Sequence, residues 1–452
     1  MIHTPDDPIA ALATPLAPSA LAVIRVSGAG SLALLSRLLS GGGDIGRRGG
    51  NTIHRRVIRD GAEDVDEVMV AVYKAPRSYT GEDGAEIFCH GSLPVMRRIM
   101  SLLGRSGFRP AGPGEFTQRA FLRGKMDLTR AEAVNEIVRA KTDRARGLAL
   151  QRLSGAIEGR IREARDNLVE IRASLEVMID YPDEDPGGGA VNEVILDRTI
   201  ALLAGLAKSY ARGRIYQEGA SVAIAGATNS GKSSLFNLLL KQDRAIVSEI
   251  HGTTRDYLEE VVSIEGIPIR LFDTAGMRDS SDPLEREGMR RTESVLEGAD
   301  LVVFIVDSTR AASRADEELL ARLANGGRRG LVRAWNKTDL PESRPAPAGF
   351  VRISALTGEG IQDLERAIST AVLIDAPAET GEPLLDSERQ RDLIERSLAA
   401  LARFRLAREG GMPLDCLAVD LAEALEALGE ITGEVTSTEI LERMFSTFCV
   451  GK

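Results

Sequence analysis

The chain has 452 residues, 43% of them apolar and 27% charged, which is enough for about three domains with large cores. Its formal net charge of −10 excludes a globally basic nucleic-acid-binding protein. No run approaches the roughly 18–20 apolar residues that span a bilayer, and the first residues show no signal peptide. Cys89, Cys416 and Cys449 are widely spaced and lack metal-ligand spacing, so we expect reduced thiols in a cytoplasmic protein.

Residues 1–123 predict an N-terminal α+β domain. Short β-rich runs alternate with turns, and we expect strands at Leu21–Val26, Glu67–Tyr73 and Ala85–Cys89. The apolar spacing of Leu93–Leu103 favours a helix. Gly41–Gly50 is glycine-rich and is expected to form a loop.

Residues 124–218 and 377–452 are predicted to be helical. From Asp127 apolar residues recur at helical spacing, until Pro182 and Pro186–Gly189 end the pattern, and a further helix is expected over Val191–Tyr210. Beyond Ser387 the chain is again rich in Ala, Leu, Glu and Arg. We expect one discontinuous helical domain with a nucleotide-binding domain inserted at residues 219–376. Two independent helical modules are the alternative.

A phosphate-binding loop follows the predicted strand Ser221–Ala225. Residues 226–234 read Gly-Ala-Thr-Asn-Ser-Gly-Lys-Ser-Ser and lead into a predicted helix, the strand–loop–helix context that the G-x-x-x-x-G-K-[ST] pattern requires. Glycines let backbone N–H groups surround phosphates, Lys232 reaches the β- and γ-phosphates, and Ser233 offers a hydroxyl to Mg²⁺. The loop alone is compatible with an ATPase, a kinase or a GTPase.

Four further motifs and one buried strand follow in the order that a GTPase needs. Thr253 and Thr254 lie in a polar loop, Asp273-Thr274-Ala275-Gly276 follows a strand, and Leu301–Val306 is a buried strand that ends at Asp307. Asn336-Lys337-Thr338-Asp339 follows the next strand, and Ser354-Ala355 supply the last loop. The Asp339 carboxylate accepts two hydrogen bonds from guanine, where adenine has no matching donors. Together the five motifs predict a P-loop, Ras-like hydrolase of GTP.

The residue that usually orients the attacking water is missing. Met277 stands where a glutamine is expected after Asp-Thr-Ala-Gly, and a methionine cannot orient water. The candidates to replace it are the acidic residues that follow: Asp279, Asp282, Glu285 and Glu287. For at least three of them we expect only a solvated switch helix.

Several segments together resemble the MnmE (TrmE) family of tRNA-modification GTPases over nearly the whole chain. Residues 252–256 (Gly-Thr-Thr-Arg-Asp) and the terminal Phe448-Cys449-Val450-Gly451-Lys452 are similar to that family. So are, in the N-terminal region, residues 13–15, 24–28, 79–83, 109–110, 113–117, 119–122 and 125–128. Two departures are Thr228, where a proline is common, and residues 15–20, which lack the usual glycine-rich run.

The resemblance implies a fold, partners and a reaction. The N-terminal domain is expected to bind a formyl-tetrahydrofolate, such as 5-formyl-tetrahydrofolate, and to form a constitutive homodimer. With an MnmG-type FAD- and NADH-dependent partner, in an expected heterotetramer, the protein would build a carboxymethylaminomethyl-type group on C5 of the wobble uridine (U34) of certain tRNAs. K⁺-dependent dimerisation of the G domains would activate GTP hydrolysis.

The resemblance also assigns roles to residues. Glu285 would be the catalytic carboxylate, Ser233 and Thr254 would hold Mg²⁺, and Asn229, Ser248, Ile250 and Thr253 would surround K⁺. Arg25, Glu86, Lys125 and Lys452 would contact folate, and Cys449 is either a functional thiol or a packing residue. The predicted GTP contacts are Asn229, Ser230, Gly231, Lys232, Ser233, Ser234, Ser248, Glu249, Ile250, His251, Gly252, Thr253, Thr254, Asp273, Thr274, Ala275, Gly276, Asn336, Lys337, Asp339, Ser354 and Ala355.

Two other functions compete with this interpretation. A ribosome-assembly GTPase would also carry Asn229 in its phosphate loop, but it does not need the terminal Cys-x-Gly-Lys. A scaffold whose nucleotide only switches assembly would hydrolyse GTP slowly even with K⁺. Between Arg139 and Arg172 the local net charge is +4, which suits either tRNA phosphates or a solvated helix face.

Overall fold

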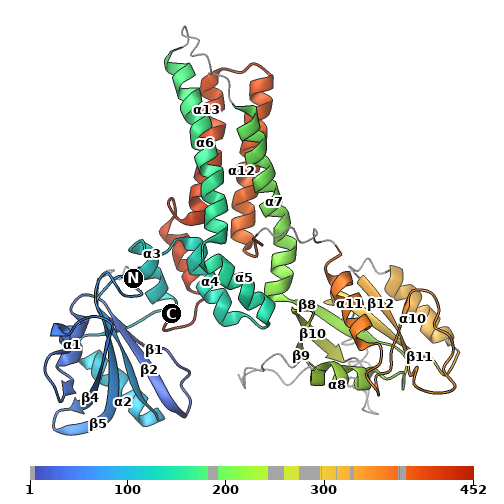
Figure 1. The fold of residues 1–452 in the computed structure, drawn as a ribbon, viewed down its shortest axis with the longest axis horizontal. Helices are drawn as coiled ribbons and strands as arrows, with labels where there is room; N and C mark the ends of the chain where they lie inside the picture. The colour runs from blue at the N-terminus through green and yellow to red at the C-terminus, as the bar shows by residue number, and fades with distance from the viewer. Residues whose placement is uncertain are drawn as a thin grey trace, which may run out of the picture. The chain divides into compact units, whose positions relative to one another are not determined.

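The computed structural model describes residues 6–181, 192–242, 259–273, 298–325 without 312, 330–374 and 383–452, together with 296 and 376. These residues form two compact units, the first made of residues 1–135 with 429–452 and the second of residues 136–428. Each unit contains one β-sheet (Figure 1). No helix among these described residues is long and apolar enough to cross a membrane.

The first unit is built on a seven-stranded sheet with the order β3-β4-β5-β6-β2-β1-β7. All neighbouring strands are antiparallel except the pair formed by β1 and β7. The strands are β1 (Ile9–Leu12), β2 (Ser19–Ser27), β3 (Leu39–Ser40), β4 (Thr52–Asp60), β5 (Glu63–Tyr73), β6 (Gly84–Gly91) and β7 (Arg109–Pro110). The strands predicted from sequence lie within β2, β5 and β6. β4 was not predicted, and the glycine-rich loop contains the short 3₁₀ helix η1 (Ile45–Arg47).

One face of this sheet is covered and the other is largely open. Helices α1 (Ser31–Ser36) and α2 (Leu93–Arg105) bury Leu35, Met96 and Ile99 against the inward residues of the strands. Because strand side chains alternate between faces, the neighbours of those inward residues face away from α2. On this second face, Leu21, Ile53 and Met69 are 60%, 62% and 42% exposed. No helix or strand that the structure describes covers these apolar side chains.

A buried ionic network holds the first unit together around Arg119, which lies on α3 (Glu115–Leu122) and is only 3% exposed. Its guanidinium donates to Asp7 Oδ1 at 2.7 Å and to Glu115 Oε1 at 2.9 Å, and lies 3.4 Å from Glu82. Arg109 binds Asp7 and Glu115 from the other side. The network therefore joins the start of the chain, the loop before β6, β7 and α3.

The helical stretch that was predicted to begin at Asp127 is three helices. They are α4 (Leu128–Arg139), α5 (Asp143–Leu153) and α6 (Ala156–Asp180). Thr142 begins α5 because its side chain accepts a hydrogen bond from Ala145 N at 3.1 Å. Gly155, with φ 93°, makes the break before α6 in a conformation that other residues rarely adopt. Apolar periodicity continues across both breaks, which is why the sequence pattern did not reveal them.

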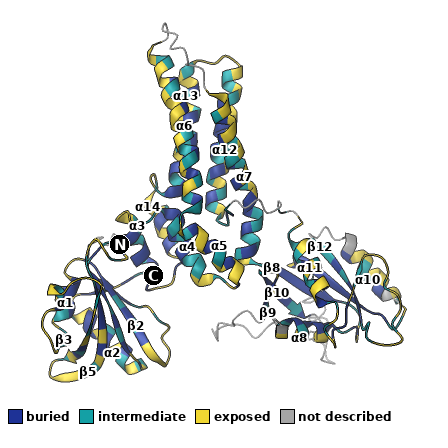
Figure 2. Ribbon diagram, in the orientation of Figure 1, coloured by how far each residue is buried: buried dark blue, intermediate teal, exposed yellow. Residues whose placement is uncertain are grey.

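Helices from both sides of the nucleotide-binding region pack together. α6 contacts α7 (Glu193–Glu218), and α7 contacts α12 (Glu388–Glu409) over much of their lengths (Figure 1). Arg405 and Arg408 of α12 form ion pairs with Asp197 and Glu193 of α7. Arg403 ties α12 to α13 (Leu414–Thr432) through Asp420. Buried and exposed residues alternate along α6 and α12, as amphipathic bundle helices require (Figure 2).

The inserted region has a six-stranded sheet of order β13-β12-β11-β8-β10-β9. Only the β9–β10 pair is antiparallel. The strands are β8 (Ala220–Ala225), β9 (Glu259–Ile264), β10 (Ile267–Asp273), β11 (Leu301–Asp307), β12 (Gly330–Asn336) and β13 (Phe350–Arg352), and the helices are α8 (Lys232–Gln242), α10 (Arg314–Asn325) and α11 (Ile361–Val372). β8 and β11 are buried at every position, as expected of strands covered on both faces.

The predicted fold class is confirmed: an N-terminal α+β region, a discontinuous helical domain and an inserted Ras-like domain. The last helix, α14 (Thr438–Phe445), belongs to the first unit. The boundaries at residues 123, 218 and 376 stay predictions.

Arg119→Ala tests the ionic network. The substitution leaves the Glu82 carboxylate, only 3% exposed, buried without this partner. Arg123 still pairs with Glu82 at 2.9 Å, so we expect the first unit to lose about 1.5–3 kcal/mol of stability, the cost of losing the hydrogen bonds that Arg119 donates to the carboxylates of Asp7 and Glu115. Hydrogen exchange of β1 and β2 amides against urea concentration measures the loss. Arg98→Ala is the control, since Arg98 pairs with Asp60 at the surface and should leave exchange nearly unchanged. Equal effects of both substitutions would contradict the structural role given to Arg119.

Candidate functional site: a nucleotide pocket at the strand ends

Four parallel strands deliver the nucleotide motifs to one edge of the second sheet. β8 pairs in parallel with β10 and β11, and β11 pairs in parallel with β12. The carboxyl ends of these strands therefore lie side by side, where ligands bind in open α/β sheets. Residue 226 follows β8, and β10, β11 and β12 end at Asp273, Asp307 and Asn336.

The phosphate loop is shaped by two glycines. Gly226 and Gly231 have φ values of 152° and 102°. A Cβ atom on Gly226 would lie 2.2 Å from the Ile305 carbonyl oxygen, and one on Gly231 would lie 2.2 Å from Asn336 Nδ2. Only glycine fits at either position. The loop passes directly into α8, so backbone N–H groups of the loop and of the helix start are available to an anion.

The side chain of Lys232 folds back over the phosphate loop. Its ammonium donates to the carbonyl oxygens of Gly226 at 3.1 Å and Ala227 at 2.8 Å, and the residue is 7% exposed. The positive charge thus stands beside the phosphate-binding N–H groups. Asn229, by contrast, is exposed and has a left-handed φ of 63°.

Two oxygen groups suited to a magnesium ion meet at the loop's end. Ser233 Oγ donates to Asp273 Oδ2 at 3.0 Å, and Asp273 is 8% exposed. A hydroxyl and a carboxylate next to a phosphate site fit Mg²⁺, which takes oxygen ligands from protein and phosphate together.

The base-recognition motifs meet around Asn336, which is 2% exposed. Its Nδ2 donates to the Ser230 carbonyl oxygen at 2.8 Å, and its Oδ1 accepts from Ala355 N at 2.9 Å. One side chain thus fastens the phosphate loop to the last base loop. Asp339 lies three residues further on, half-buried, and its carboxylate makes no hydrogen bond to any residue that the structure describes.

An ion pair that the motifs did not predict lies beside this turn. Lys337 Nζ is 2.6 Å from Asp307 Oδ2. Burial alone would raise the pKa of Asp307, but hydrogen bonds from Lys337 and Thr309 outweigh it and hold the pKa below its usual value. The sequence indicates that Asp307 ends a buried strand, but it does not indicate that this strand lies beside β12.

Several predicted residues lie outside the described part of the chain. They are Ser248, Glu249, Ile250, His251, Gly252, Thr253, Thr254, Thr274, Ala275, Gly276, Met277, Asp279, Asp282, Glu285 and Glu287. The switch threonines, most of the K⁺ ligands and the catalytic carboxylate therefore stay predictions.

In the first unit, Arg25 is the centre of a second cluster of predicted residues. Its guanidinium pairs with Glu86 at 2.8 Å and donates to the Gly451 carbonyl oxygen at 2.8 Å. It lies 5.8 Å and 5.6 Å from the ring centroids of Tyr79 and Phe116. Lys125 donates to the Pro76 carbonyl oxygen at 2.9 Å, in the loop between β5 and β6 that also carries Tyr79. Two rings beside a cation and a carboxylate are compatible with a flat heteroaromatic ligand such as a pterin.

The C-terminal segment docks on the first unit mainly through its backbone. Gly114 N donates to the Cys449 carbonyl oxygen at 3.3 Å, and Phe116 N donates to that of Lys452 at 3.1 Å. Phe445 and Phe448 are 2% and 6% exposed and pack with Leu128. Val450 is 53% exposed, and the Cys449 side chain is also exposed.

The other described cysteines differ in their surroundings. Cys416 is exposed, whereas Cys89 is buried in the core of the first unit. Burial raises the pKa of Cys89 to about 11, so this thiol stays protonated and unreactive near neutral pH.

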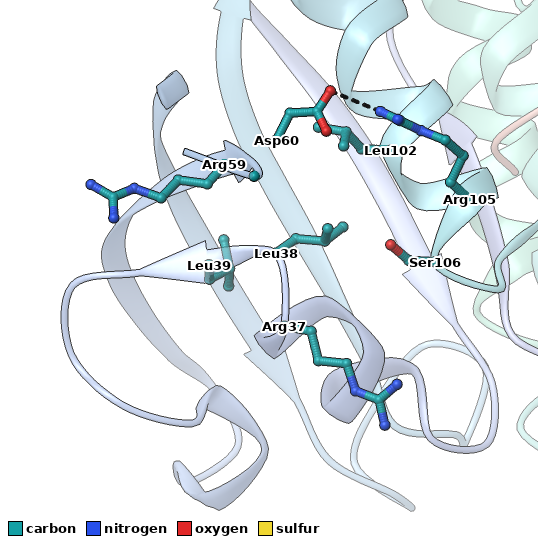
Figure 3. Close-up of a pocket in the computed structure, with 9 residues that line it drawn as sticks. Arg37, Leu38, Leu39, Arg59, Asp60, Leu102, Arg105 and Ser106 are labelled. Atoms are coloured by element: carbon teal, nitrogen blue, oxygen red, sulfur yellow. Dashed lines mark hydrogen bonds and ion pairs between the residues drawn. The ribbon is translucent and has the colours of Figure 1, made fainter. Parts of the chain in front are cut away.

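A pocket of about 360 Å³ also opens in the first unit, but it contains none of the predicted site residues. Figure 3 shows Arg105 reaching Asp60 while Arg37 and Arg59 extend in different directions. Because these cations do not converge, the pocket offers no cradle for an anion.

The basic stretch between Arg139 and Arg172 is largely neutralised by acidic neighbours. Arg146, Arg160, Arg162 and Arg172 pair with carboxylates within one turn of the same helix. Arg152 is buried against Glu136 and Asp386. These contacts favour the solvated-face interpretation over a patch for tRNA phosphates.

Comparison with known proteins covers the whole chain. Residues 8–125 match the family described as GTP-binding protein TrmE N-terminus, and residues 128–449 match the MnmE helical domain. Proteins named tRNA modification GTPase MnmE are similar along their full lengths. The one from Geotalea uraniireducens is 40% identical over 99% of both chains. The one from Streptococcus mutans is 40% identical over 100% of both chains. The one from Treponema denticola is 42% identical over 99% of this chain and 98% of the relative. The chain therefore belongs to the MnmE (TrmE) family, and it is a GTPase.

Proposed function

We propose that this GTPase acts in tRNA modification. With an MnmG-type flavin-dependent partner, it would add a carboxymethylaminomethyl-type group to C5 of the wobble uridine of certain tRNAs. A formyl-tetrahydrofolate would supply the one-carbon unit. The observation that carries this proposal is similarity over 99–100% of both chains to relatives named for tRNA modification, so that no region of those proteins lacks a counterpart.

The chemistry of hydrolysis is assigned to residues around the phosphate loop. Ser233 and Thr254 would bind Mg²⁺, and the contact between Ser233 and Asp273 supports an oxygen-lined site there. Asn229 would bind K⁺ together with Ser248, Ile250 and Thr253, and Glu285 would orient the attacking water. Cation charge next to the phosphates stabilises the charge that develops during phosphoryl transfer, as an arginine finger does.

Folate binding is assigned to the Arg25 cluster. Arg25 and Lys125 suit the carboxylates of the glutamate tail, whereas Glu86 suits the amino-pyrimidinone edge of the pterin. Glu86 already binds Arg25, and it also accepts from the Tyr73 hydroxyl at 3.2 Å. These two contacts fix the orientation of the Glu86 carboxylate before a ligand binds. Lys452 would complete the site.

A homodimer through the N-terminal region is supported by the open face of its sheet. Ile53 and Met69 expose apolar surface on the adjacent strands β4 and β5, and Leu21 does so on β2, beyond β6; exposed apolar surface commonly marks a protein–protein interface. We further propose a cytoplasmic location, where GTP, tRNA and reduced thiols are found together.

Asp339→Asn tests guanine recognition. The substitution removes the negative charge and can present an amide donor to the donors of guanine, so GTP binding should weaken by about 10²-fold or more. Isothermal titration with GTP and GDP measures the change. Asp363→Asn, at an exposed site on α11, is the control. Tight GTP binding by Asp339→Asn would show that the base-recognition assignment is wrong.

Turnover in different salts tests the cation site. Asn229 offers a side-chain oxygen next to the phosphates, and Met277 provides no group to orient water. GTP hydrolysis should rise strongly in KCl and stay low in NaCl at equal ionic strength, because Na⁺ fits a K⁺ cage poorly. Asn229→Ala should remove the difference. Equal rates of the unmodified protein in the two salts would refute K⁺ activation.

Cys449→Ser separates the C-terminus from GTP hydrolysis. The Cys449 side chain is exposed, and this residue contributes to the docking of the segment through its backbone carbonyl, so serine should preserve the docking. We expect GTP turnover near that of the unmodified protein and loss of wobble-uridine modification, measured by nucleoside analysis in a cell that depends on this protein. Cys416→Ser controls for removal of an exposed thiol. Normal modification in Cys449→Ser would leave Cys449 without a chemical role.

A further inference from the structure

Asp307, the last residue of β11, and Ser308, which follows it, contact the turn of residues 336–339 at three points, and the proposed function gives them no role. Lys337 Nζ lies 2.6 Å from Asp307 Oδ2. Ser308 N donates to the Asn336 carbonyl oxygen at 2.9 Å, and Ser308 Oγ donates to that of Lys337 at 3.0 Å. Asp307 and Ser308 are 6% and 0% exposed, so the β11 side of these contacts is buried, while the Lys337 side chain is 31% exposed.

Asp307 is itself held in one orientation. Its Oδ1 accepts from the backbone N and the Oγ1 of Thr309, at 3.0 Å and 2.7 Å. With Oδ1 occupied in this way, Oδ2 is directed at the Lys337 ammonium. A charge-assisted hydrogen bond with a fixed acceptor restricts the lysine far more than a surface ion pair would.

The turn needs such support. Lys337 has φ 67°, a left-handed conformation that lysine rarely adopts and that persists only where its surroundings fix it. On the other side, Thr338 Oγ1 donates to the Ile353 carbonyl oxygen at 2.9 Å. Asp339 makes no side-chain hydrogen bond to a described residue, so the backbone of the turn alone sets where its carboxylate points.

We propose that Asp307 and Ser308 are positioning residues for guanine recognition. They hold residues 336–339 so that the Asp339 carboxylate is pre-aligned with the N1–H and exocyclic amine of the base. This inference depends on the proposed role of Asp339. Pre-alignment removes part of the ordering cost of binding and therefore favours the base that uses both hydrogen bonds.

The test is the preference for GDP over IDP, whose base lacks the exocyclic amine. Asp307→Asn keeps the shape of the side chain but loses the charge that holds Lys337, and Ser308→Ala removes one hydrogen bond with little change in volume. For Asp307→Asn we expect the dissociation constant of IDP divided by that of GDP to fall roughly tenfold, equivalent to about 1.4 kcal/mol. Ser308→Ala should also lower this ratio. This variant provides the test if Asp307→Asn does not fold.

Asp316→Asn is the matched control. Asp316 is 3% exposed and accepts hydrogen bonds from Ser313 N and Oγ at 3.0 Å and 2.8 Å, so it caps α10 and contacts no residue of the turn. Its substitution should leave the GDP-to-IDP ratio unchanged. A purely structural role for Asp307 would lower thermal stability in both aspartate variants and leave both ratios intact, which would overturn the proposal.

Asp339→Asn separates the two levels of the argument. If it abolishes the preference for GDP while Asp307→Asn and Ser308→Ala keep it, the positioning role is wrong and the assignment of Asp339 stands. If Asp339→Asn itself keeps the preference, the base assignment fails, and the positioning role fails with it. Loss of the preference in Asp339→Asn and a reduced preference in Asp307→Asn and Ser308→Ala, with an unchanged preference in Asp316→Asn, support the proposal.

Discussion

The parallel pairing of β8, β10, β11 and β12 is the constraint on which the nucleotide site depends. Parallel strands have their carboxyl ends on the same edge, so motifs up to 110 residues apart in sequence, from Gly226 to Asn336, meet there without any direct sequence link. Asn336 then fixes the spacing between two of them, since it binds both Ser230 and Ala355. The phosphate loop and the base loop are therefore set by one side chain at the sheet edge.

A second long-range constraint shapes the first unit. Arg25 on β2 donates to the carbonyl oxygen of Gly451, so a strand near one end of the sequence is tied to a segment near the other. Gly451 has φ 91°, and a Cβ atom there would lie 2.8 Å from the Leu12 carbonyl oxygen. The glycine of the Cys-x-Gly-Lys motif is thus required by close backbone packing, which is a reason for the motif that is independent of any chemistry of Cys449.

The fold class and the nucleotide motifs were predictable because each rests on local pattern: short alternating runs for β2, β5 and β6, and fixed spacing for the phosphate loop. The breaks at Thr142 and Gly155 were missed since apolar periodicity continues through them, and only capping chemistry marks them. The pairing of Asp307 with Lys337 depends on strand order, which no local pattern contains. The same holds for Arg25 and Glu86, whose opposition follows from the β2–β6 register.

The helices hold the chain at the point where it leaves the nucleotide-binding domain. Arg152 donates to the Leu384 carbonyl oxygen at 3.0 Å and pairs with Asp386 at 2.6 Å, while Leu385 N donates to Ser209 Oγ at 3.0 Å. A Cβ atom at Gly213 would lie 1.9 Å from the Leu385 carbonyl oxygen, so α7 accepts the returning chain only at a glycine.

The β9–β10 turn provides a contact from the nucleotide site to the helices. Thr142 Oγ1 donates to the Gly266 carbonyl oxygen in this turn at 2.8 Å, and the same hydroxyl caps α5. β10 runs from the turn to Asp273, beside Ser233. One strand, β10, therefore extends from the turn that contacts Thr142 to the residue that contacts Ser233.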